Sequence, residues 1–103
     1  MTMHRTLVDL VDNRIVSALK KNEISLSKDK VDVLLIGHGS KDPNAGISIN
    51  YIVDELRNTY KNVDRCYLEI EEPNIEQGIQ SCQKSNPDVL VIMFYFLHEV
   101  FAN

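Results

Sequence analysis

Three ionisable residues at or near the ends of apolar runs are the best candidates for chemistry in this chain. His38 follows the run Val31–Ile36 within the sequence Gly-His-Gly-Ser, Glu69 comes near the end of a second run, and His98 directly follows a third. Imidazole and carboxylate groups suit divalent cobalt, nickel, iron or zinc, and either accepts protons when its pKa is tuned. Metal binding or proton transfer is therefore the predicted chemistry.

The segment around His38 predicts a buried strand that ends in a tight turn. Residues 31–36 are short, rich in β-branched side chains and apolar on successive positions, which is typical of a strand covered on both faces of a parallel sheet. Asp42 and Pro43 then begin a helical pattern, so N–H groups of a helix start point toward the same place. Ligands bind at this end of open α/β sheets. A strand-end histidine without a special role is the alternative.

The other elements predict an α/β fold with a parallel sheet. We expect an amphipathic helix over residues 1–21, a polar linker over 22–30 and an α/β domain over 31–103. Within that domain the pattern predicts strands over Val31–Gly37, Val63–Ile70 and Val89–Leu97, the last fully buried, with helices over Pro43–Tyr60 and Asn74–Lys84 between them. The order β-α-β-α-β implies right-handed crossovers and three layers, with His38, Glu69 and His98 at one edge of the sheet.

Apolar residues at helical spacing predict which helix faces are buried. The expected buried positions are Leu7, Leu10, Val11, Ile15, Ala18 and Leu19 in the first helix, Ile49, Ile52, Val53, Leu56 and Tyr60 in the second, and Ile75, Ile79 and Cys82 in the third. Packing of the first helix on the sheet is the expected arrangement. Pairing with another copy, or docking to a partner, is the alternative.

Composition excludes several classes of function. The chain has 103 residues and a net charge of −4, which gives no basic field for nucleic acid. No apolar run is long enough to span a bilayer, and residues 1–14 lack a signal-peptide core, so we expect a cytoplasmic protein without membrane contact. Cys66 and Cys82 form no CxxC pair, which favours two free thiols over a disulfide.

Well-known catalytic motifs are absent from the chain. It contains no GxxxxGK[ST] phosphate loop and no GxSxG nucleophile elbow. Ser40 has no candidate base and acid pair beyond His38 to activate its hydroxyl, which argues against a serine hydrolase. Gly37 stands where a histidine phosphatase would need an arginine before its nucleophile.

Three segments resemble the small sirohydrochlorin chelatases, which belong to the class II chelatase group. The segments are LLIGHGSKDPNA, YLEIEEPNIEQGI and VLVIMFYFLHE, and together they span about Val31–Glu99. The resemblance implies a chelatase-like α/β half domain. It also implies a lyase that inserts Co²⁺ or Ni²⁺ into a sirohydrochlorin-type tetrapyrrole, on a path to cobalamin or a related cofactor.

The resemblance also implies roles for individual residues. His38 matches the family's first metal-handling histidine, which binds the metal or accepts a pyrrole proton, and Glu69 matches an acidic metal-site position. His98 is a candidate third metal ligand. The expected substrate-binding residues are Gly37, Gly39, Ser40 and Lys41, with the helix start and the lysine charge holding a substrate carboxylate. The metal is a substrate, no organic cofactor is expected, and the chain is expected to work as a homodimer with the site between subunits.

One part of the family pattern is missing. Relatives carry Gly-x-His after the third strand, whereas this chain has Val100, Phe101 and Ala102, and the usual fourth strand and closing helix are absent. We therefore expect a chelatase that is truncated at its C-terminus. The alternatives are a non-catalytic remnant that binds metal or tetrapyrrole, and an interaction domain. The apolar last strand is expected to be covered by the first helix on one face and by a second subunit on the other.

Overall fold

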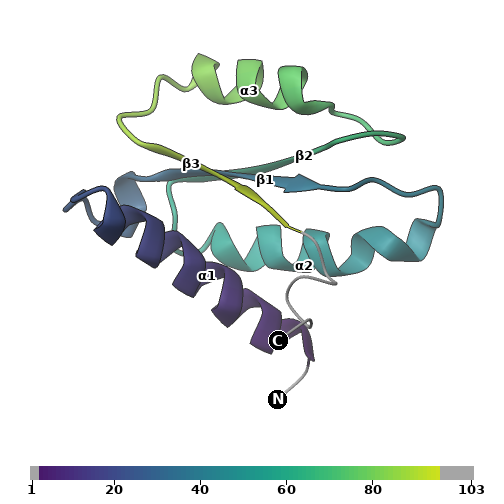
Figure 1. Cartoon of the computed structure of the whole chain (residues 1–103), viewed down its shortest axis with the longest axis horizontal. Coiled ribbons are helices and arrows are strands. Elements are labelled where there is room, and N and C mark those ends of the chain that lie inside the picture. Colours follow the sequence, from purple (N-terminus) through teal and green to yellow (C-terminus); the bar gives the residue numbers. More distant parts are fainter. Residues whose placement is uncertain (1–2, 96–103) are drawn as a thin grey trace.

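The computed structural model describes residues 3–95, which form a three-stranded parallel sheet with helices on both faces (Figure 1). The strands are β1 (Asp32–Gly37), β2 (Asn62–Tyr67) and β3 (Leu90–Phe94), and the α-helices are α1 (Met3–Lys21), α2 (Ile47–Leu56) and α3 (Ile75–Lys84). Short 3₁₀ helices at Lys28–Lys30 and Pro43–Gly46 precede β1 and α2. The predicted α/β class and three-layer parallel architecture are therefore confirmed. None of the helices in this described part is long and apolar enough to cross a membrane.

The sheet has the order β2-β1-β3, so β1 is the central strand. Gly37 of β1 pairs with Tyr67 of β2, and Ile36 pairs with Phe94 of β3. Every residue of β1 is buried, as the continuous apolar run predicts, because β1 has a neighbour on each side and helices on each face. The carboxyl ends of all three strands meet at one edge of the sheet.

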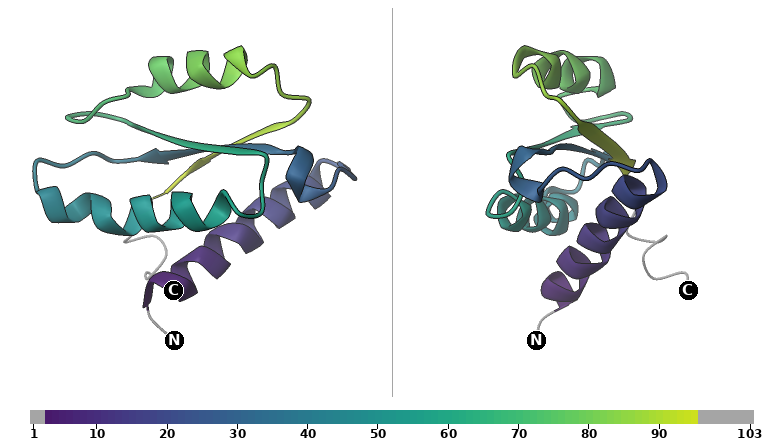
Figure 2. Two further views of the ribbon diagram at one scale, coloured as in Figure 1. Left: turned by 180° about the vertical axis from the view of Figure 1, so that it is seen from behind. Right: turned by 90° about the vertical axis from the view of Figure 1, so that its left-hand side faces the viewer.

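Helices α1 and α2 cover one face of the sheet and form the larger core (Figure 2). The predicted buried face of the second helix is confirmed at Ile49, Ile52, Val53 and Leu56 and at Tyr60 beyond the helix end. In α1 the prediction is wrong at Leu10, which is 39% exposed. The predicted positions Leu7, Val11, Ile15 and Leu19 are buried, Val8 joins them, and Leu10 lies on another side of the helix.

Helix α3 covers the opposite face through a smaller core. Leu34 and Ile36 of β1, Cys66 of β2 and Cys82 of α3 are buried there, with Ile75 and Ile79 packed against them. Both thiols are free and buried, as predicted. Burial, followed by the negative charges of Asp64 and Asp32 and by Cys66, raises the pKa of Cys82 to about 11, which keeps this thiol protonated at neutral pH.

Two predicted strands differ from the observed ones. Strand β2 ends at Tyr67 rather than Ile70. The chain folds back at Ile70, which has a φ of +71°, and the Tyr67 N–H is donated to the carbonyl of Pro73 at 2.9 Å. The prediction of a fully buried last strand is also wrong for its described residues. Strand β3 lies at the edge of the sheet, and Ile92 and Phe94 are 46% and 49% exposed because α3 packs over β2 and β1.

Two glycines in or beside helices allow a matched test of packing. A Cβ added at Gly78 of α3 would lie 2.7 Å from the Cβ of Cys66, whereas one at Gly46 would meet nothing nearer than Asn50 Nδ2 at 3.6 Å. We predict that Gly78→Ala lowers the free energy of unfolding by about 1–3 kcal/mol. Gly46→Ala should leave it unchanged or raise it by roughly 0.5 kcal/mol. Urea unfolding followed by circular dichroism measures both, and equal stabilities would contradict the close approach of α3 to β2.

Candidate functional site

The structure brings His38 and Glu69 together at the carboxyl edge of the sheet. His38 directly follows β1, Glu69 lies two residues beyond β2, and His38 Nε2 is 3.6 Å from Glu69 Oε1. Both side chains are largely exposed, at 67% and 61%. The parallel pairing of the two strands produces the predicted convergence, although the residues are far apart in sequence. The pair presents an imidazole nitrogen and a carboxylate oxygen to solvent.

Backbone hydrogen bonds continue past the ends of β1 and β2 and hold the two segments side by side. The Leu68 N–H is donated to the Gly37 carbonyl at 2.9 Å, and the Glu69 N–H is donated to the His38 carbonyl at 3.3 Å. Gly39 has a φ of +98°, and a Cβ there would lie 1.8 Å from the carbonyl oxygen of Glu69. Only glycine fits this close approach.

A tight turn at Ile70 directs two carboxylates toward the turn that carries His38. Ile70 has a φ of +71°, and the Glu71 N–H is donated to the Glu69 carbonyl at 2.7 Å across it. The half-buried Glu71 then accepts the backbone N–H of Ser40 through Oε2 at 2.9 Å. Glu69 and Glu71 therefore reach the same loop from neighbouring positions.

The other predicted substrate-binding residues lie around this pair. The Ser40 hydroxyl accepts the N–H of Asp42 at 3.0 Å, and Asp42 in turn caps the following 3₁₀ helix through the N–H of Asn44, as predicted. The backbone N–H and the hydroxyl of Ser40 are thus both engaged within the protein. Lys41 is exposed.

Gly37 is buried rather than open to solvent. A Cβ there would lie 3.2 Å from both the Ile49 side chain and the Tyr67 ring. His98, the predicted third ligand, lies outside the described residues. Within residues 3–95 no group of three or more His, Cys, Asp or Glu side chains is placed to hold a metal ion. Among the described residues, the structure thus brings together two of the three predicted metal ligands, His38 and Glu69.

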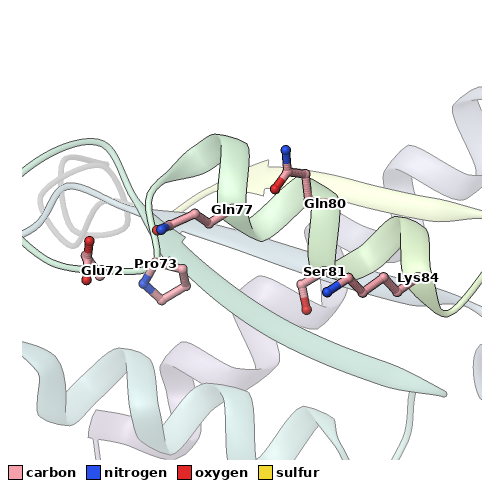
Figure 3. Close-up of a pocket in the computed structure, with 6 residues that line it drawn as sticks. All are labelled: Glu72, Pro73, Gln77, Gln80, Ser81 and Lys84. Carbon is pink, nitrogen blue, oxygen red and sulfur yellow. The ribbon is translucent and has the colours of Figure 1, made fainter.

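Two hollows lie away from the His38–Glu69 pair. The larger, about 500 Å³, runs along the outer side of α3 (Figure 3) and is lined by Glu72, Pro73, Gln77, Gln80, Ser81 and Lys84. The smaller, about 80 Å³, lies beside Asp32, a carboxylate that is 1% exposed and accepts the Ser85 hydroxyl at 3.0 Å. Neither His38 nor Glu69 lines either hollow.

Sequence reasoning missed Glu71 as part of this site. The acidic run Glu69–Glu72 is visible in the sequence, but which of its carboxylates reaches the loop that carries His38 depends on where β2 ends. A strand through Ile70 would only place Glu69 and Glu71 on the same face of the sheet. The turn at Ile70 brings Glu71 to the backbone of Ser40, which no local pattern indicates.

Gly39 gives a direct test of the contact between the two loops. We predict that Gly39→Ala forces the loops apart and destabilises the protein by about 1–3 kcal/mol, since both the positive φ and the nearby Glu69 carbonyl oppose a side chain. Amide chemical shifts in a ¹H–¹⁵N spectrum should change for residues 37–41 and 68–71. Spectra that overlay in these segments would contradict the contact.

Comparison with known proteins shows which family the chain belongs to. The CbiX family model matches residues 32–101. The chain is 33% identical over 92 residues to a sirohydrochlorin ferrochelatase of Priestia megaterium, an alignment that covers 84% of this chain and 35% of that protein. It is 36% identical over 69 residues to a sirohydrochlorin cobaltochelatase of the same organism, covering 63% of this chain and 22% of that protein. The chain thus spans about a third or less of the length of these relatives. Because the family match covers more than half of its residues, this protein belongs to the CbiX family.

Proposed function

We propose that this chain is a cytoplasmic chelatase that inserts a divalent metal, Co²⁺ or Ni²⁺, into a sirohydrochlorin-type tetrapyrrole. The observation that carries the proposal is the exposed His38–Glu69 pair at the carboxyl edge of the sheet. Membership of the CbiX family supports it, as does similarity to proteins named for iron and cobalt insertion into sirohydrochlorin. We also propose that the reaction is a step toward cobalamin or a related cofactor.

The chemistry needs a site that binds a metal ion and then gives it up. Insertion exchanges M²⁺ for two pyrrole N–H protons, so the products are the metallated macrocycle and two protons. In our proposal His38 Nε2 and a Glu69 carboxylate oxygen hold the cation weakly, with water completing its coordination. As the macrocycle nitrogens take the metal, the freed imidazole accepts one pyrrole proton and the second passes to solvent water, and Glu69 stabilises the resulting imidazolium from 3.6 Å. The high exposure of both side chains leaves room for a flat substrate.

The donor set leaves the choice of metal open to experiment. One imidazole and one carboxylate bind Fe²⁺, Co²⁺, Ni²⁺ and Zn²⁺ with affinities that follow their general order, so selection depends on supply and on the substrate. The two relatives are named for different metals, iron and cobalt. Fe²⁺ therefore belongs in every assay beside Co²⁺ and Ni²⁺.

A second candidate function is binding of metal or tetrapyrrole without insertion. One sequence observation favours it: the chain has Val100, Phe101 and Ala102 where the resemblance to the chelatases would place Gly-x-His. An interaction domain is the weaker alternative, since it gives His38 and Glu69 no role. The first experiment separates these options.

Metal insertion tests the proposed roles of His38 and Glu69. Purified protein, anaerobic sirohydrochlorin and Co²⁺, Ni²⁺ or Fe²⁺ are mixed, and the change in the visible band of the macrocycle is followed against a protein-free control. We expect acceleration by the wild type, loss to the uncatalysed rate for His38→Ala, and a rate decrease of about tenfold to a hundredfold for Glu69→Gln.

The matched control is Glu72→Gln, which removes the same charge three residues from Glu69. Glu72 is exposed and lines the larger hollow along α3, away from the His38–Glu69 pair, so this variant should keep the wild-type rate. Full activity in His38→Ala would overturn the proposed role. A wild-type rate equal to the protein-free rate, with macrocycle or metal still bound, would support the non-catalytic alternative.

We propose further that the chain works as a homodimer. The edge strand β3 has no charged residue from Leu90 to Phe94, and Ile92 on it is nearly half exposed. Monomeric proteins usually protect such an edge with charges, prolines or bulges. A second copy would cover this apolar surface without bringing like charges together, although the chain as a whole is negative.

Substitution of Ile92 tests the dimer. We expect the wild type to sediment as a dimer and Ile92→Lys to shift it toward monomer, because a buried, unpaired ammonium in the interface is costly. Ile47→Lys places the same charge at a residue of similar exposure on α2 and should leave the dimer intact. Analytical ultracentrifugation gives both masses. A wild type that is monomeric at every concentration would exclude the homodimer.

A further inference from the structure

We infer that Glu71 is a positioning residue that holds the turn carrying His38 in place opposite Glu69, an inference that rests on the metal-handling role proposed for that pair. Glu71 does not need to touch the metal for this. Its carboxylate acts through the backbone of Ser40, two residues beyond His38.

The contact between Glu71 and Ser40 is a strong hydrogen bond in a partly buried place. Glu71 Oε2 lies 2.9 Å from the Ser40 nitrogen, and the contact joins residues 31 positions apart in sequence. A carboxylate that accepts a backbone N–H forms a charge-assisted bond, stronger than one between neutral groups. Glu71 is half-buried, whereas Glu69 and Glu72 on either side are exposed. Its burial singles it out within the acidic run.

The backbone around Glu71 is bent so that this contact can form. Ile70 has a φ of +71°, a conformation that is unfavourable for a β-branched residue, and its side chain remains 58% exposed. Burial of the Ile70 side chain therefore does not explain the turn. Its effect is to present Glu69 and Glu71, two residues apart, to the same loop. Such conformations persist where the surrounding contacts hold them, and they occur often at functional sites.

The Glu71 contact restrains a part of the loop that the strand ladder does not reach. The bonds to the carbonyls of Gly37 and His38 fix the backbone up to His38. The next residue is Gly39, which is the most freely rotating residue type. Beyond it, Ser40 is held to the opposite loop by Glu71. Contacts with the opposite loop thus hold the backbone on both sides of His38, and loss of the Glu71 contact removes the one made through Ser40.

Three variants test this role by NMR without any need for catalysis. The probes are hydrogen exchange of the Ser40 amide and paramagnetic broadening of the His38 ring signals by substoichiometric Co²⁺ alone. For Glu71→Ala we expect Ser40 exchange to rise about tenfold or more and Co²⁺ affinity at His38 to fall severalfold. Glu71→Gln keeps an acceptor oxygen of the same length and should restore part of both. Glu72→Gln removes the neighbouring charge and should match the wild type.

The outcomes separate this inference from the proposed function. Unchanged Ser40 exchange in Glu71→Ala would overturn the positioning role, and so would raised Ser40 exchange with a Co²⁺ affinity at His38 equal to that of the wild type. If Co²⁺ does not broaden His38 in the wild type, the proposed metal role fails, while Ser40 exchange still reports whether Glu71 fixes the turn. A fall in global thermal stability as large in Glu72→Gln as in Glu71→Ala would also contradict a local role.

Discussion

The parallel pairing of β1 with β2 is the constraint on which the candidate site depends. That ladder does not stop where the strands stop, because the N–H groups of Leu68 and Glu69 still reach the carbonyls of Gly37 and His38. The ladder fixes the relative position of two loops, one after β1 and one after β2, that are far apart in the sequence. The imidazole and the carboxylate therefore lie 3.6 Å apart as a consequence of backbone geometry, with little help from burial of either side chain.

The two faces of the sheet contribute unequally to the fold. The larger core, under α1 and α2, holds most of the buried apolar side chains. At its margin Asp12 of α1 accepts the Tyr60 hydroxyl at 2.5 Å and forms a salt bridge with Lys28 at 2.9 Å. Burial of Tyr60, followed by this hydrogen bond, raises its pKa. The face under α3 is thinner and leaves part of β3 open. The central strand is thus rigidly supported, while the edge strand has an exposed apolar surface.

Much of the fold could be predicted because its signals are local. The apolar run before Gly37, the Asp42-Pro43 helix start and the period of α2 each follow from neighbouring residues. The errors concern long-range facts. Nothing near Leu90–Phe94 says that this apolar strand lies at an edge, since that depends on sheet order. Likewise, the end of β2 depends on a hydrogen bond from Tyr67 to Pro73, and the engagement of Glu71 with Ser40 follows from that ending. The meeting of His38 and Glu69 at one edge of the sheet was predictable from parallel topology, whereas their separation of 3.6 Å depends on the direct pairing of β1 with β2.

The central place of β1 also has a consequence for how the chain is made. Both partners of β1 come later in the sequence, and β2 begins only at Asn62. During synthesis the central strand β1 therefore leaves the ribosome about 30 residues, or several seconds, before its first partner. In that interval α2, which lies between β1 and β2 in the sequence, is also made. The central strand therefore gains its first neighbour in the sheet only once the whole crossover through α2 has been made.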